Sequence, residues 1–141
     1  MTANLQVHHN EEEIQIVQFR NDSYYWQKEL AFINEEIEFY LDVLNSSSIK
    51  KSMSKAVEAH DLIHQFNNLK ETNEKYQLKC EVFRNRLEGQ SECDEVECDY
   101  AYVKAHFTFR SKIEKHLNNV RKVKQSAFIY LRNRIGKVHI E

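Results

Sequence analysis

Apolar residues in the first third of the chain recur at alternating steps of three and four positions. This spacing places them on one face of an α-helix. It predicts a helix over about residues 10–45, preceded by a flexible tail at residues 1–9, with Asn10 and Glu13 as a capping pair. The stretch Asn21-Asp22-Ser23 could instead interrupt this helix. The series comprises Ile16, Phe19, Ser23, Trp26, Leu30, Ile33, Ile37, Tyr40 and Leu44.

The same spacing resumes after the polar stretch at residues 45–48 and predicts a second helix over about residues 49–88. Gly89 follows it, and glycine readily adopts the left-handed conformation that ends many helices. The members of this second series are Ala59, Leu62, Phe66, Leu69, Asn73, Tyr76, Cys80, Phe83 and Leu87.

A third series predicts a helix over about residues 92–135, capped by Ser91 and followed by Gly136 as a second stop. Its spacing slips near Arg110. The members are Val96, Tyr100, Val103, Phe107, Ile113, Leu117, Val120, Ala127, Leu131 and Val138.

These three amphipathic helices with short connections predict an all-α fold and a single domain over residues 1–141. Short connections make successive helices antiparallel neighbours. We therefore expect an up-down-up antiparallel bundle of three long helices with coiled-coil-like packing. The chain has no proline and two glycines, which disfavours folds built on tight turns or glycine-rich phosphate loops.

Additional apolar residues lie beside the main series on the first and third helices. A helix that is apolar over more than its core-facing arc often contacts another partner. This pattern predicts an interaction face and a homodimer that could form a larger bundle, unless the extra aromatic residues only widen the core. The residues of this predicted face are Tyr25, Phe32, Phe39, Val43, Tyr102, Phe109, Phe128 and Tyr130.

Two cysteines and five carboxylates lie within residues 92–99. Cys93 and Cys98 are five positions apart, about 140° around a helix, and zinc fingers use cysteine pairs two to four residues apart. Acidic residues are also expected in the first turns of a helix. We therefore interpret the segment as a helix corner, which leaves Glu97, Cys98 and Asp99 without an assigned role.

Three histidines form the best metal-ligand candidates. His60 and His64 are four positions apart on the second helix, and the antiparallel topology brings His116 near their level. However, His60 and His64 lie away from the apolar series, and the Glu-x-x-His pairs of di-iron bundles are absent from the sequence. A metal-binding bundle is thus the second alternative function, and we assign no metal or cofactor.

Charge is unevenly distributed. Residues 1–45 carry nine acidic and two basic residues, whereas residues 110–141 carry nine basic and two acidic residues. The two segments could neutralise each other by packing side by side, or the basic half of the third helix could follow a nucleic-acid backbone. The isoelectric point of about 6.4 argues against a dedicated nucleic-acid binder, which remains the first alternative.

The remaining features fit a cytoplasmic, non-catalytic protein. The three cysteines are an odd number, the N-terminus is unlike a signal peptide, and no apolar run of about 18 residues could span a membrane. No spaced catalytic motif occurs. The sequence therefore predicts a protein–protein interaction or scaffolding module that binds itself or another protein.

Overall fold

The computed structural model describes residues 2–46, 49, 56–90 and 96–140, with the side chains of residues 14–46, 49, 57–86 and 103–134. The described residues form three long helices, α1 (Thr2–Leu44), α3 (Ala56–Gln90) and α4 (Val96–Ile140), and none of them lies in a strand. The all-α prediction is therefore confirmed.

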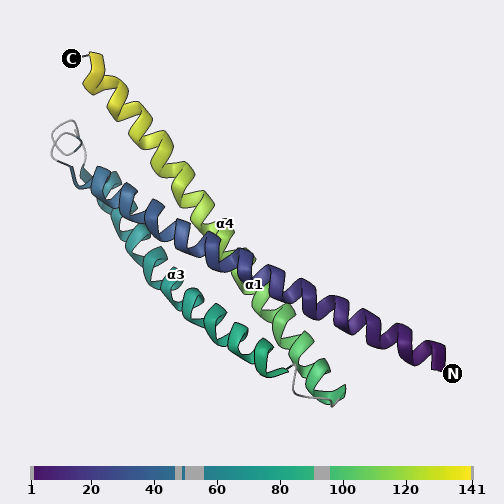
Figure 1. Cartoon of the computed structure of the whole chain (residues 1–141). Helices are drawn as coiled ribbons and strands as arrows, with labels where there is room; N and C mark the ends of the chain where they lie inside the picture. The colour runs from purple at the N-terminus through teal and green to yellow at the C-terminus, as the bar shows by residue number, and fades with distance from the viewer. Residues whose placement is uncertain (1, 47–48, 50–55, 91–95, 141) are drawn as a thin grey trace.

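The three helices run up, down and up, as predicted. Figure 1 shows α1 and α3 side by side, and these two helices share the largest contact in the bundle. α4 packs against both. The N-terminal part of α1 extends beyond α3 at one end, and the C-terminal part of α4 extends beyond the other two helices at the opposite end (Figure 1).

Each helix extends past one of its predicted ends. α1 begins at Thr2 rather than near Asn10, so residues 2–9, which the sequence predicted as a tail before the helix, belong to α1. Adding residues to an existing helix is much easier than nucleating one, and no proline or glycine interrupts this segment. α1 also continues through residues 21–23 without a break, because Phe19 and Trp26 are buried on either side and hold the segment against the bundle.

The two glycines do not end their helices. α3 extends through Gly89 to Gln90, and α4 extends through Gly136 to Ile140, contrary to prediction. A glycine inside a helix costs about 1 kcal/mol relative to alanine, which is too little to stop a helix whose neighbours favour it. The predicted helical residues 50–55, the Ser91 cap and Cys93 lie outside the described residues.

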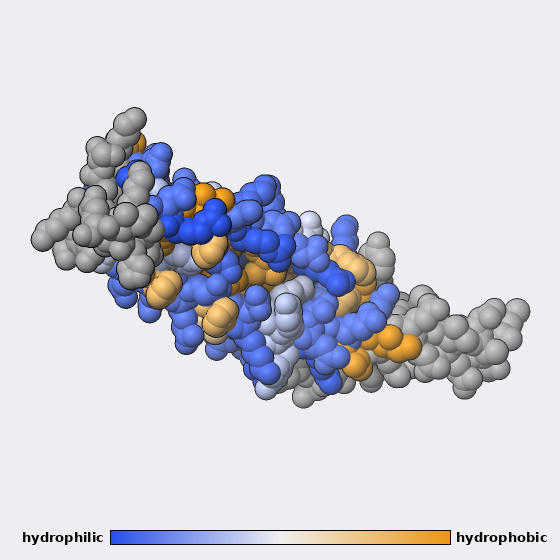
Figure 2. Space-filling view, turned by 90° about the horizontal axis from the view of Figure 1, so that it is seen from above, coloured by the Kyte–Doolittle hydropathy of each residue, from blue (hydrophilic) through white to orange (hydrophobic). Residues whose placement is uncertain are grey.

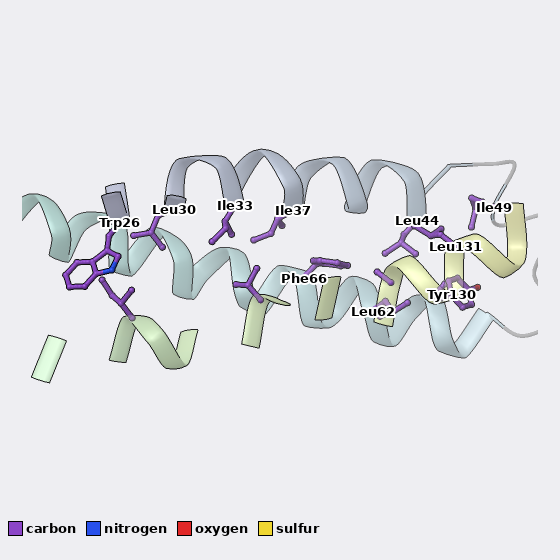
Figure 3. Packing of buried hydrophobic residues seen from close by; sticks show 14 of the residues in the cluster. Trp26, Leu30, Ile33, Ile37, Leu44, Ile49, Leu62, Phe66, Tyr130 and Leu131 are labelled. Carbon is purple, nitrogen blue, oxygen red and sulfur yellow. The ribbon is translucent and has the colours of Figure 1, made fainter. Parts of the chain in front are cut away.

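The core follows the predicted series on α1 and α3. In Figure 3, Leu30, Ile33 and Ile37 project from α1 into the space between the helices, and Phe66 lies beneath them. The Phe66 ring stacks on Tyr40, with centroids 5.1 Å apart and planes at 8°. Each fully buried side chain of this size contributes about 1.5–3 kcal/mol through the hydrophobic effect. The apolar rows alone thus explain how α1 and α3 pair.

On α4 the predicted core positions are partly wrong. Phe107 was expected to face inward but is 49% exposed, whereas His106 and Phe109 are buried. The buried row runs without a slip through His106, Phe109, Ile113, His116 and Val120. Two members of this row are histidines, and the prediction counted only apolar residues as buried. It therefore placed the buried positions one residue out of phase near Arg110.

Candidate functional site

An exposed row of aromatic side chains lies along α1. Tyr25, Phe32 and Phe39 are 60%, 55% and 60% exposed, and they recur every seven residues. Seven residues are nearly two turns of an α-helix, so the three rings lie in one row on its outer surface. We call these three residues the aromatic strip. They are the part of the predicted interaction face that α1 leaves open to solvent.

The other predicted members of that face differ in their solvent exposure. Phe128 is exposed on α4, and Val43 is half-buried against the core. Phe109 and Tyr130 are only 6% and 7% exposed, so they do not extend the exposed face as predicted: both rings pack into this chain's own core. The side chain of Tyr102 lies outside the described residues.

The strip runs beside the seam between α1 and α4. Lys124 Nζ lies 2.8 Å from Glu36 Oε2 and 3.0 Å from Glu36 Oε1, which joins the two helices by an ion pair. Phe39 is one turn after Glu36, and Phe128 is one turn after Lys124. Both exposed rings therefore border the same ion pair, one from each helix.

Carboxylates accompany the strip, and basic residues occupy α4. Glu35 and Asp42 are exposed on either side of Phe39 along α1. The neutralisation expected between α1 and α4 is realised, among the described residues, by the Lys124–Glu36 pair, while Arg110 pairs with Glu114 within α4. Arg121 and Lys122 remain exposed. The surface thus keeps an acidic side and a basic side.

On the face drawn in Figure 2, hydrophobic residues form small patches separated by hydrophilic ones. No single broad apolar area covers that face. Interfaces built on narrow rows of this kind bury less area than obligate dimers do.

Beneath this surface, a polar network connects all three helices. The side-chain amide nitrogen of Asn73 on α3 donates to the Leu30 carbonyl oxygen at 2.8 Å and to Asn34 Oδ1 at 2.7 Å. The Asn34 amide nitrogen donates to Gln77 Oε1 at 2.7 Å. His116 Nε2 on α4 lies 2.9 Å from Asn73 Oδ1. We call these residues the asparagine layer.

The geometry of the asparagine layer fixes the protonation of His116. Asn73 Oδ1 can only accept, so His116 Nε2 must carry the hydrogen and donate it. Burial lowers the pKa of His116 below its ordinary value of 6.5. The ring packs against Tyr76, with centroids 5.1 Å apart. His116 is therefore a neutral structural donor in the core.

A second buried histidine lies nearer the N-terminal end of α4. His106 is fully buried between aromatic rings: its centroid is 3.5 Å from Phe19 and 5.3 Å from Trp26, nearly parallel to both. Its Nε2 lies 3.5 Å from Asp22 Oδ2, which is too long for an ordinary hydrogen bond. Neither ring nitrogen has a hydrogen-bond partner among the described residues.

Burial lowers the pKa of His106 to about 4, against the opposing influence of Asp22, while the positive charge of Arg110 lowers it further. The neutral ring is therefore the form that the fold accommodates.

The predicted metal candidates do not come together. His60 and His64 are exposed on α3. His116 instead bonds to Asn73. Asn73 follows His64 by nine residues on α3, which separates His116 from the level of His64 by about 14 Å. In the part of the chain that the structure describes, no three histidine, cysteine, aspartate or glutamate side chains are arranged to hold a metal ion.

Cys80, the cysteine whose side chain the structure describes, is not placed as a reactive thiol. Cys80 is a buried free thiol on α3, and burial raises its pKa to about 12. A thiol with such a high pKa is a poor nucleophile, and Cys80 serves as a small apolar core residue. Glu97, Cys98 and Asp99 belong to the first turn of α4, but their side chains lie outside the described ones.

Ser23 is a polar residue buried in the core, and its replacement gives a testable prediction of stability. Its side chain is 1% exposed, and its hydroxyl has no hydrogen-bond partner among the described residues. Replacement by alanine removes an unsatisfied polar atom and improves helix propensity. We expect Ser23→Ala to raise the free energy of unfolding by about 1 kcal/mol, as measured by urea denaturation. A loss of stability would show that the hydroxyl is satisfied in solution.

Within the described ranges, no helix combines the length and the apolar character needed to cross a membrane. Comparison of the chain with protein-family models, with curated proteins and with solved structures gives no match. The geometry above is therefore the basis for assigning a function.

Proposed function

We propose that this protein is a non-catalytic helical interaction module of the cytoplasm that associates with a second copy of itself through the aromatic strip. The observation that carries the proposal is the row formed by Tyr25, Phe32 and Phe39, with each ring more than half exposed. Tyr, Trp and Phe are enriched at the cores of protein interfaces, where a few residues carry most of the binding energy. Three of them in one row on a surface helix are costly to leave in water.

A second copy suits this strip because the chain also carries the complementary charges. The strip is flanked by carboxylates such as Glu35 and Asp42, and α4 exposes bases such as Lys104 and Lys112. An exposed apolar ring lies near these bases as well, since Phe107, one turn after Lys104, is 49% exposed. Complementary potentials of this kind guide association and select against other alignments.

The test is the mass of the protein as a function of concentration. We expect sedimentation equilibrium to show an average mass above that of one chain at high concentration. Replacing both Phe32 and Phe39 by serine removes two buried rings from the interface and should weaken association about hundredfold. Because both residues are exposed in the single chain, its helix content and melting temperature should stay nearly unchanged.

A matched control comes from α3. Val57 and Leu78 are 67% and 64% exposed, so Val57→Ser with Leu78→Ser removes similar exposed apolar surface outside the strip. This control should associate like the wild type. A strictly monomeric wild type, or equal loss of association in both double variants, would contradict the proposal.

A further inference from the structure

An open groove lies between α3 and α4 on the side of α4 that faces away from the aromatic strip. Its volume is about 450 Å³. Phe83, Ala105 and Phe109 line its apolar part, and the two phenyl rings are stacked with centroids 4.9 Å apart. Lys79, Lys104 and Lys112 stand at its edges. We call this feature the lysine groove.

The three lysines give the lining of the groove a net positive charge. Lys79 lies over the Tyr76 ring, with Nζ 5.5 Å from the ring centroid, and none of the three lysines pairs with a carboxylate among the described residues. Lys104 and Lys112 are eight positions apart on α4, which separates them by about 12 Å along the helix. The groove therefore fits an aromatic side chain with a negative charge on either side.

One segment of this chain has that chemistry. Phe39 is 60% exposed, and Glu35 and Asp42 stand before and after it on α1, both exposed. The two carboxylates are seven positions apart, or about 10.5 Å along the helix, close to the lysine spacing.

We infer that the lysine groove of one copy receives the Phe39 segment of another, with the Phe39 ring against Phe83 and Phe109. Glu35 and Asp42 then pair with Lys104 and Lys112. This inference rests on the self-association proposed above and names the surface that receives the strip.

The position of the two surfaces determines the form of the assembly. The Glu36–Lys124 ion pair places Phe39 level with about residue 127 of α4, whereas the groove is centred near residue 108. These levels are about 28 Å apart along the bundle. The segment and the groove are thus separate surfaces, so one contact between two copies leaves a segment on one copy and a groove on the other. These two either pair with each other in a two-fold dimer or bind further copies head to tail.

Complementation between two defective variants tests this arrangement. Phe32→Ser with Phe39→Ser removes the aromatic rings of the segment and keeps the groove intact. Lys104→Glu with Lys112→Glu reverses the charge of the groove and keeps the segment intact. We expect each double variant alone to associate at least about tenfold more weakly than the wild type. An equimolar mixture should form a 1:1 complex in sedimentation velocity, because one intact segment meets one intact groove.

Two controls make the result specific. Arg121→Glu with Lys122→Glu makes the same charge change on exposed residues of α4 outside the groove, and it should associate like the wild type. Circular dichroism should show that the groove variant keeps the helix content of the wild type, since Lys104 and Lys112 are exposed.

The outcomes separate this inference from the proposed function. If the wild type is monomeric, both are wrong. If the strip variant loses association but the groove variant keeps it, the strip is correct and the groove is wrong. A mixture that remains monomeric, or a control variant as defective as the groove variant, also overturns the groove assignment.

Discussion

Replacing Asn73 by alanine should lower the free energy of unfolding by about 3–5 kcal/mol, as much as truncating a large core side chain. The Asn73 side chain is fully buried and bonds to Leu30, Asn34 and His116. Alanine leaves the His116 N–H and the Asn34 carbonyl oxygen without this partner in the core. Urea denaturation at neutral pH measures the loss.

Two further variants identify its cause. Asn67 is exposed on α3, so Asn67→Ala should change stability by less than about 0.5 kcal/mol. Replacing Asn73 and His116 together by leucine removes donor and acceptor at once, and should recover much of the stability lost in Asn73→Ala. If Asn73→Ala has no more effect than Asn67→Ala, the asparagine layer does not form in solution.

The second large effect is a loss of stability in acid that depends on His106. The pKa of His106 is lowered from 6.5 to about 4 in the fold, mainly by burial. Between these values the unfolded chain binds a proton that the folded chain does not, so stability falls as the pH decreases through this window. The loss of stability caused by His106 reaches about 3 kcal/mol near pH 4 and then levels off. His116, whose pKa is also lowered by burial, acts in the same direction.

The difference between wild type and His106→Phe isolates this contribution, because other titrating groups are common to both proteins. Phenylalanine retains the aromatic contacts with Phe19 and Trp26 and cannot take up a proton. We expect the variant to lose about 3 kcal/mol less than the wild type when urea denaturation is compared at neutral pH and near pH 4. Parallel losses in the two proteins would show that His106 stays protonated or solvent-accessible in the fold.

The sequence predicted the parts of the fold that depend on apolar residues. The rows on α1 and α3 place Leu30, Ile37 and Phe66 correctly in the core, and the strip residues Tyr25, Phe32 and Phe39 outside it. Ser23 and Asn73 also stood in the predicted rows as polar members, which signalled buried polar positions. Their bonding partners were not predictable, since Asn73 bonds to residues 39 and 43 positions away in the chain.

The incorrect predictions have two physical causes. On α4, neutral imidazole rings pack like aromatic side chains, so treating His106 and His116 as polar moved Phe107 inward and Phe109 outward. At the helix ends, Gly89 and Gly136 were treated as stops although one glycine costs little in a long helix. The lysine groove was also missed, because Lys79 and Lys104 approach each other only when α3 and α4 pack together.

The asparagine layer has a consequence for the alignment of the helices. Sliding α3 by one heptad along α1 would still bring apolar residues opposite apolar residues, so the hydrophobic effect alone distinguishes such alignments weakly. When that shift is toward the C-terminal end of α1, it would place the Asn73 amide beside Ile37 and Leu41, which have no side-chain acceptor, at a cost of about 1–3 kcal/mol for each unsatisfied group. The apolar rows therefore stabilise the bundle, and this one layer selects which of its possible registers the chain adopts.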